Sequence, residues 1–269
     1  MPVTLLFVEG DLDEELLINV FAGAPAVHKA GSKYALKGIV VAARREKGNQ
    51  SVEFLRDRDF DTETDLALPD TPRPVLTPRS GDRLGWMWFR HSIECYLLEP
   101  RLAAMALNEP QARLETLLRQ AGEELLVYQA ARWTAGQARA KLPPSRNLET
   151  HPPALDGDFA LPVDLSEQGC WAWLSTSPRD FILPVTEAFT ETALRVSFER
   201  YRVKLSGLDI PGILAWFSGK NLLAFLAPRI GTQSAGEIRN RLRDWVRNNP
   251  DEALALLPEW VTLKNLLAQ

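Results

Sequence analysis

The feature that most constrains the fold is residues 51–61 (SVEFLRDRDFD), where an apolar run leads directly into three acids at alternate positions. The run is typical of a buried β-strand, and Asp57, Asp59 and Asp61 follow its carboxyl end. Because strand side chains repeat every two residues, we expect the three carboxylates on one face if the strand continues. At ~4 Å and an effective dielectric of ~20, each pair of carboxylates repels by roughly 4 kcal/mol. A divalent cation would relieve that repulsion, whereas a solvated acidic turn would need none.

A second apolar run, residues 4–8 (TLLFV), ends at Glu9 and Gly10. The next ten residues, 11–20, predict a helix, because acids occupy its first turn and apolar residues follow at helical spacing. Glu9 therefore lies between a strand and a helix, at the edge where open α/β sheets bind ligands. Asp13, in the first turn of that helix, is placed where it can point back to the same edge.

The middle of the chain gives weaker signals. Residues 84–90 (LGWMWFR) are typical of a strand, and a helix that contains Glu94 is predicted to start just after His91. Residues 38–43 fit a strand or a helix equally well. The proline-rich residues 65–81 favour an irregular loop.

The second half predicts mainly helices. Asn108 as cap and Pro110 in the first turn suit a helix that runs to about residue 140. Residues 142–153 have paired prolines at both ends and favour a linker, and residues 156–183 predict short strands or turns. Further helices are expected over 187–204, over 221–226 and after the capping pattern at residues 234–237.

Composition excludes several classes of protein. The chain of 269 residues can bury a sizeable core, and its two cysteines, Cys95 and Cys170, predict no disulfide framework. No secretory leader or membrane-spanning apolar run is seen, so a soluble cytoplasmic protein with no membrane partner is expected. The formal net charge of −4 argues against a simple electrostatic nucleic-acid binder.

The absence of several common motifs excludes further classes of enzyme. The chain has no phosphate-binding loop, no dinucleotide fingerprint, no C-x-x-C pair and no G-x-S-x-G elbow, and its three histidines are dispersed. The chemistry-bearing groups that remain are acids at strand ends. Oxygen ligands suit Mg²⁺ or Mn²⁺, which can activate water and stabilise a leaving oxygen in phosphodiester hydrolysis.

Two of these patterns resemble a known family. Residues 8–13 (VEGDLD) are similar to the glutamate motif of the TOPRIM fold, V-E-G-x-x-D, and residues 57–59 are similar to its D-x-D motif. The longer segment FLRDRDFD, followed by RHSIECYLL, resembles a narrower group of TOPRIM-like nucleases from phage-defence operons. That group includes the effector subunit of the phage anti-restriction-induced system and is distantly related to the overcoming-lysogenisation-defect nucleases. Residues 218–220 (SGK) followed by two leucines resemble a late motif of the same group.

The resemblance implies an α/β fold with a TOPRIM-like, mostly parallel sheet flanked by helices. Together with the prolines and the helical spacing described above, this gives a TOPRIM-like catalytic core over residues 1–140, a proline-rich linker over 141–155 and a mainly helical C-terminal part over 156–269, packed on the core. The implied metal ligands are Glu9, Asp13, Asp57, Asp59 and Glu94. The implied catalytic residues are Glu9, Asp57, Asp59 and Lys220, with His91 and Asp61 as auxiliary residues.

The same resemblance implies a Mg²⁺- or Mn²⁺-dependent endonuclease, a hydrolase, acting as the toxic effector of an antiviral defence system. An ABC-type ATPase sensor would be its partner. RNA is favoured over DNA as substrate, with transfer RNA cleavage known among relatives. A homodimer is one possible oligomeric state. The alternative is a non-catalytic TOPRIM-like subunit that binds the partner ATPase. A third hypothesis is phosphoryl transfer or nucleotide binding at the same metal site.

Basic and aromatic residues leave further alternatives open. The aromatic run at residues 86–89 suits base stacking or a buried strand. Two arginine-rich helical stretches suit phosphate contacts or a solvated helix face. They comprise Arg195, Arg200, Arg202 and Lys204, and then Arg239, Arg241, Arg243 and Arg247.

Overall fold

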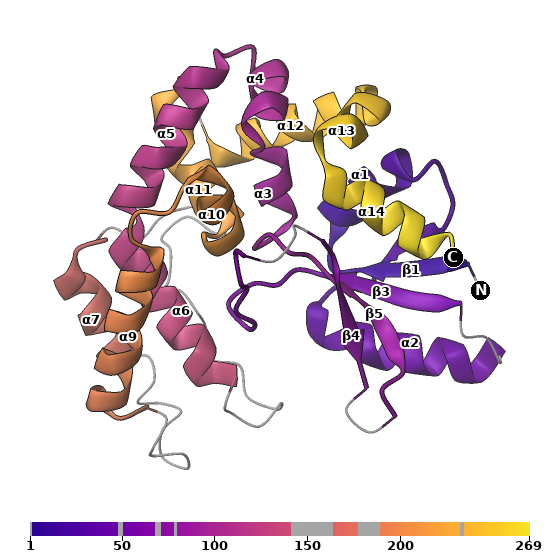
Figure 1. Ribbon diagram of the computed structural model, residues 1–269, viewed down its shortest axis with the longest axis horizontal. Coiled ribbons are helices and arrows are strands. Elements are labelled where there is room, and N and C mark those ends of the chain that lie inside the picture. Colours follow the sequence, from indigo (N-terminus) through magenta and orange to yellow (C-terminus); the bar gives the residue numbers. More distant parts are fainter. Residues whose placement is uncertain are drawn as a thin grey trace. The chain divides into compact units, whose positions relative to one another are not determined.

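The fold is built on one five-stranded sheet with the strand order β2-β1-β3-β5-β4 (Figure 1). Strands β2, β1, β3 and β5 run parallel, and β4 pairs antiparallel with β5. The strands are β1 Leu5–Val8, β2 Ala26–Lys29, β3 Val52–Arg56, β4 Arg73–Leu76 and β5 Arg83–Met87. The expected α/β class with a mostly parallel sheet is therefore confirmed. The computed structural model describes residues 2–47, 51–67, 71–77, 80–140, 164–176, 189–231 and 234–269.

The chain divides into two units, and the first contains the sheet. Unit 1 comprises Met1–Arg58, Asp65–Gln111 and Arg239–Gln269. Its helices are α1 Asp11–Val20, α2 Lys33–Lys47, α3 Ile93–Leu97, α4 Pro100–Leu107, most of α12 Ala235–Asn248, α13 Pro250–Leu256 and α14 Pro258–Leu267.

Unit 2 is helical and comprises Asp59–Thr64 and Ala112–Ile238. Its elements are α5 Gln111–Glu124, α6 Leu126–Ala140, α7 Glu167–Thr176, α9 Glu191–Leu205, α10 Ile210–Trp216, α11 Gly219–Leu226 and the 3₁₀ turn η2 Ala227–Arg229. These units differ from the predicted domains, since the last helices return to the sheet and Asp59–Thr64 joins the helical unit. The predicted linker, 141–155, lies outside the described residues.

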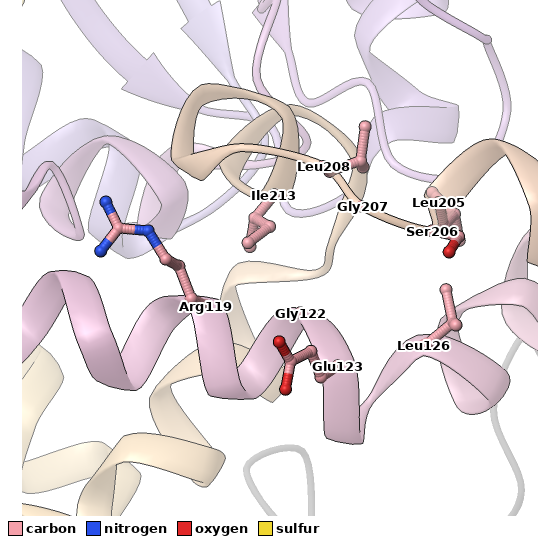
Figure 2. A pocket seen from close by; sticks show the side chains of 9 residues that line it. All are labelled: Arg119, Gly122, Glu123, Leu126, Leu205, Ser206, Gly207, Leu208 and Ile213. Atoms are coloured by element: carbon pink, nitrogen blue, oxygen red, sulfur yellow. The ribbon is translucent and has the colours of Figure 1, made fainter.

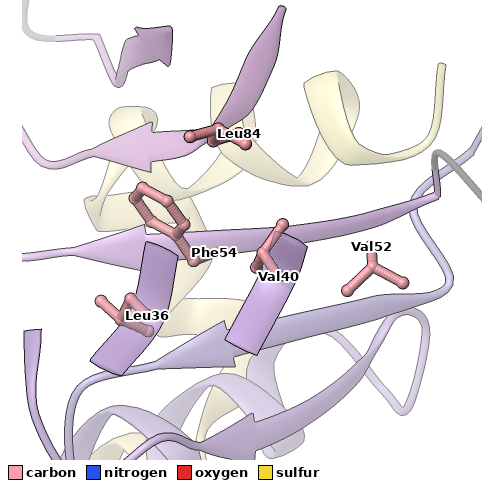
Figure 3. Close-up of a cluster of buried hydrophobic side chains, with 5 residues drawn as sticks. All are labelled: Leu36, Val40, Val52, Phe54 and Leu84. Carbon is pink, nitrogen blue, oxygen red and sulfur yellow. The ribbon is translucent and has the colours of Figure 1, made fainter. Parts of the chain in front are cut away.

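Helix α2 covers one face of the sheet. Its buried Leu36 and Val40 pack against Val52, Phe54 and Leu84, which lie on β3 and β5 (Figure 3). Their spacing of four residues places Leu36 and Val40 on one side of the helix. The cluster fixes where β3 ends, and therefore where the residues after it begin.

The C-terminal helices complete unit 1 through contacts with the start of the chain. The N–H of Val3 donates to the carbonyl of Leu267 at 2.8 Å. Buried Trp88 lies 4.9 Å from Tyr96 and 6.1 Å from Trp260 of α14, measured between ring centroids. Aromatic groups at these separations contribute beyond their buried area. Helix α14 is therefore an integral part of the sheet unit.

Two local predictions for unit 1 need correction, and one open alternative is decided. Residues 38–43, open between strand and helix, lie in α2. The loop expected over 65–81 contains the edge strand β4, whose proline, Pro74, such a strand tolerates. Asn108 does not begin a helix; it ends α4 in the left-handed conformation, with φ 56°. Asparagine is favoured both before the first turn of a helix and after its last turn, and only the backbone angle distinguishes the two roles.

Unit 2 also differs in detail from its prediction. One helix was expected up to residue 140, whereas α5 and α6 meet at Leu125. The short strands expected over 156–183 are wrong for 167–176, which form α7; residues 156–163 and 177–183 lie outside the described residues. The indole N–H of Trp133 donates to the carbonyl of Trp216 at 2.8 Å, which ties α6 to α10.

Among the described residues, no single helix has both the length and the hydropathy of a membrane span. One pair, Ile210–Trp216 with Gly219–Arg229, passes that test only together and is bent by 119°.

Candidate functional site

Glu9 and Asp57 lie beside each other at the carboxyl edge of the sheet. Strands β1 and β3 are parallel neighbours, with Phe7 opposite Phe54, so Glu9 and Asp57 leave the sheet together. The carboxylate Oε1 of Glu9 accepts a hydrogen bond from the backbone N–H of Asp57 at 3.0 Å. The predicted pairing of the first acid with the D-x-D strand end is therefore present in the fold.

The side chain of Asp57 is held by the next loop. Its Oδ1 accepts from the N–H of Ile93, the first residue of α3, at 3.0 Å. Asp57 therefore links the strand ends to the loop between β5 and α3.

Asp13 folds back over the same turn, as predicted. It lies in the first turn of α1 and is buried. A Cβ atom placed on Gly10 would lie 3.8 Å from its Oδ2. The carboxylate of Asp13 is therefore beside the Glu9–Gly10 turn rather than in solvent.

The loop between β5 and α3 contributes buried polar groups. His91, Ser92 and Glu94 are each less than a tenth exposed. The hydroxyl of Ser92 donates to Oε2 of Glu94 at 2.6 Å. Glu94 therefore lies in the first turn of α3, within two residues of the N–H group that holds Asp57.

Sequence reasoning missed Glu259, which fixes this loop from α14. Its carboxylate is buried and accepts from the N–H of Phe89 at 2.8 Å and from the hydroxyl of Tyr96. The Tyr96 oxygen in turn accepts from the N–H of Arg90 at 3.1 Å. Glu259 follows Pro258 at a helix start, where an acid is ordinary, so nothing local marks it.

The three acids were expected on one face only if the strand continued, and it does not continue. Strand β3 ends at Arg56, and Asp59 has a left-handed backbone, with φ 50°. Aspartate tolerates that conformation better than most residues, and a chain in it no longer alternates. The chain also passes from unit 1 to unit 2 between Arg58 and Asp59. Asp57 therefore belongs to unit 1 and Asp59 to unit 2.

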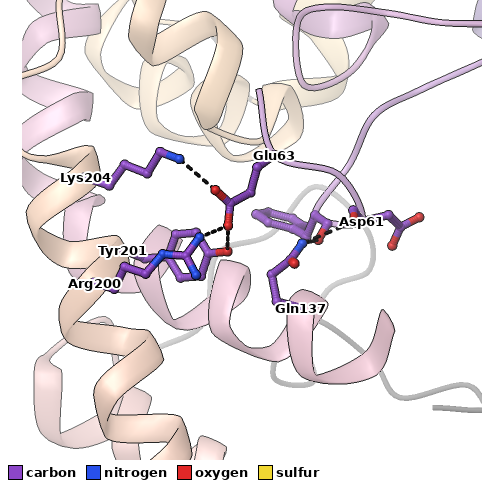
Figure 4. Close-up of polar contacts among 7 residues, drawn as sticks. Asp61, Glu63, Gln137, Arg200, Tyr201 and Lys204 are labelled. Atoms are coloured by element: carbon purple, nitrogen blue, oxygen red, sulfur yellow. Dashed lines mark hydrogen bonds and ion pairs between the residues drawn. The ribbon is translucent and has the colours of Figure 1, made fainter. Parts of the chain in front are cut away.

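Within unit 2, the acids after Asp57 have structural partners. Asp61 forms an ion pair with Arg139 at 2.7 Å. Glu63 accepts from Lys204 at 2.7 Å and from Arg200 and Tyr201 (Figure 4). These pairs fasten the segment Asp59–Thr64 to α6 and α9.

Asp59 and Lys220 both lie in unit 2, where the charge of Asp59 acts on Arg132. Burial lowers the pKa of Arg132, and the charges of Tyr128 and Asp59 oppose that shift. Arg132 also donates to Asn221, the residue after Lys220 in α11. The roles predicted for Asp59 and Lys220 in catalysis stay predictions.

Several cations of the two arginine-rich stretches have partners within their own unit. In α9, Arg195 pairs with Glu191 and Arg202 with Glu199. In α12, Arg241 donates to the carbonyl of Leu107 at 2.6 Å. These contacts favour the structural interpretation of both stretches, and Trp86 and Trp88 are buried as a strand requires.

The donor chemistry of the edge fits a hard cation, although the described residues contain no group of three or more His, Cys, Asp or Glu arranged to hold a metal ion. Glu9, Asp13 and Asp57 all offer oxygens, which Mg²⁺ and Mn²⁺ prefer. Burial raises the pKa of Cys95 to about 11, so this neighbouring thiol stays neutral and is a poor nucleophile.

A cavity of about 260 Å³ lies elsewhere, in unit 2, between α5 and the turn before α10 (Figure 2). Apolar groups such as Leu126 and Ile213 line it together with Arg119 and Glu123. It contains none of the predicted site residues. No protein-family model matches the chain, and no curated protein matches it.

Proposed function

We propose that the chain is a metal-dependent TOPRIM-type endonuclease that cleaves RNA, or DNA, as the toxic effector of an antiviral defence pair. The observation that carries the proposal is the hydrogen bond between Glu9 and the backbone of Asp57, at the ends of neighbouring parallel strands. It supports a shared acidic edge of the kind that binds Mg²⁺ or Mn²⁺.

In this proposal, Glu9 and Asp57 hold the principal cation, and Asp13 and Glu94 assist. When bound, such a cation neutralises phosphate oxygens and lowers the pKa of an attacking water. The protein's own contribution is to fix the carboxylates in advance. The N–H of Asp57 orients Glu9, and the N–H of Ile93 orients Asp57. Such preorganisation avoids reorientation during the reaction.

The partner and substrate are parts of the same proposal. An ABC-type ATPase would restrain the nuclease until a phage trigger releases it, and transfer RNA is the substrate favoured by resemblance. Purified protein alone and with the ATPase would therefore differ in cleavage of total RNA.

A cleavage assay with matched variants tests the proposal. Total RNA and plasmid DNA are incubated with the protein and Mg²⁺ or Mn²⁺. Glu9→Gln and Asp57→Asn keep the side-chain volume and should each lower the rate at least about a hundredfold, since both remove a ligand charge. Asp251→Asn, at an exposed acid of α13, should leave the rate unchanged.

Two outcomes would count against the proposal. Cleavage that survives both Glu9→Gln and Asp57→Asn would show that another site is responsible. If neither nucleic acid is cut but the same variants weaken binding to the ATPase, the non-catalytic interaction subunit is the better description.

A further inference from the structure

The corner between β2 and α2 opens onto the same edge of the sheet as Glu9. Lys29 ends β2 and pairs in register with Val8, the residue before Glu9. The N–H of Ala30 donates to the carbonyl of Val8 at 2.8 Å. Neighbouring strands lie about 4.8 Å apart, so this corner begins one strand away from the acidic turn.

The charge of α2 is opposite to that of the whole chain. The chain has 31 Lys and Arg against 35 Asp and Glu, whereas α2 (KYALKGIVVAARREK) has five cations and one acid. Lys33 lies in the first turn, which contains no acid. The helix dipole disfavours a cation there.

An exposed aromatic ring accompanies these charges. Tyr34 is 60% exposed, and the Nζ of Lys33 lies 5.7 Å from the centroid of its ring. Tyr34, Lys37 and Arg45 recur at helical spacing on one exposed face of α2. The side chain of Lys29 is 52% exposed and is held by an ion pair with Asp11.

We propose that this corner, with Lys33, Tyr34 and Lys37 of α2, binds an unpaired nucleotide of the nucleic acid beside the bond to be cut. Proteins that bind single strands combine basic groups for phosphates with aromatic rings on which bases stack. A continuous duplex hides the faces of its bases, so Tyr34 selects a single strand, a loop or an extruded base. This inference rests on the proposed nuclease function and adds the substrate class.

Binding is measured without cleavage, in the Glu9→Ala background, by fluorescence anisotropy of a short fluorescein-labelled oligouridine and of a blunt RNA duplex. Adding Tyr34→Ala should weaken oligouridine binding about tenfold or more, whereas Tyr34→Phe should retain it because the stacking face remains. Lys33→Met should reduce the slope of log affinity against log salt by about 0.7. Arg101→Ala, at an exposed arginine of α4, is the matched control and should change neither quantity.

The proposal is overturned if Tyr34→Ala binds oligouridine as its parent does, or if Tyr34→Phe is as weak as Tyr34→Ala. It is also overturned if the parent prefers the duplex or binds neither RNA. The outcome is separate from that of the cleavage assay. Loss of binding in Tyr34→Ala, with no cleavage by the wild-type protein, would keep the nucleotide surface and reject the nuclease.

Discussion

Glu259 should be the residue on which the loop after β5 depends most. Its buried carboxylate accepts from the N–H of Phe89 and the hydroxyl of Tyr96. Hydrogen bonds to a charged acceptor contribute about 1.5–3 kcal/mol each. Glu259→Ala should therefore lower the free energy of unfolding by about 3–6 kcal/mol, out of a total of about 5–15 kcal/mol for a typical domain.

Glu259→Gln separates the parts of that effect. The amide keeps an oxygen for the N–H of Phe89 but offers a donor toward Tyr96, so the loss should be about 1.5–3 kcal/mol. Urea unfolding followed by tryptophan fluorescence measures both variants, because Trp88 and Trp260 lie in the same cluster. Mn²⁺ affinity should fall as well, since this loop supplies the N–H that holds Asp57.

The control is Glu252→Gln, the same change at an exposed position of α13, which should stay within about 0.5 kcal/mol of wild type. The reasoning would be refuted if Glu259→Ala and Glu259→Gln unfolded at the same urea concentration as that control. The loop would then be held by its other contacts, and α14 would have no part in orienting Asp57.

Two further predictions concern the sheet and unit 2. Gly85→Ala should lower the free energy of unfolding by about 3 kcal/mol or more, because its Cβ would lie 2.1 Å from the carbonyl oxygen of Phe54. Gly38→Ala in α2, where a Cβ meets open space, should raise the free energy of unfolding by about 0.5–1 kcal/mol. Thermal unfolding of both variants measures the difference. Burial alone would raise the pKa of Glu63, but hydrogen bonds led by Lys204 lower it below 4.5. Glu63 therefore stabilises the fold above pH 4.5, and this contribution is lost as pH falls through the lower folded pKa. Urea midpoints against pH should lose that acid-dependent step in Glu63→Gln, and an unchanged profile would contradict the assignment.

Local signals in the sequence predicted the elements that frame the candidate site. Helix α1 has the predicted bounds, Asp11–Val20, because its first-turn acids and its apolar spacing are both local features. Strands β1 and β3 end at Val8 and Arg56, directly before Glu9 and Asp57. The prediction that Glu9 and Asp57 share one edge followed from the general rule that ligands bind at the carboxyl ends of parallel strands.

Features that depend on tertiary contacts or on one backbone angle were beyond sequence reasoning. Asp59 departs from strand geometry through a positive φ that aspartate permits but does not require. Asn108 is equally suited to begin or end a helix. Glu259 contacts Phe89 across 170 positions, and no short-range pattern encodes such a separation.

The most direct test of the central claim is a crystal of the protein soaked in Mn²⁺, with anomalous diffraction used to locate the ion. We expect an anomalous peak with carboxylate oxygens of both Glu9 and Asp57 at about 2.0–2.6 Å, the range of hard-cation bonds to oxygen. The peak should disappear in Glu9→Gln crystals. Strong Mn²⁺ peaks elsewhere, with none between Glu9 and Asp57, would contradict the proposed metal site.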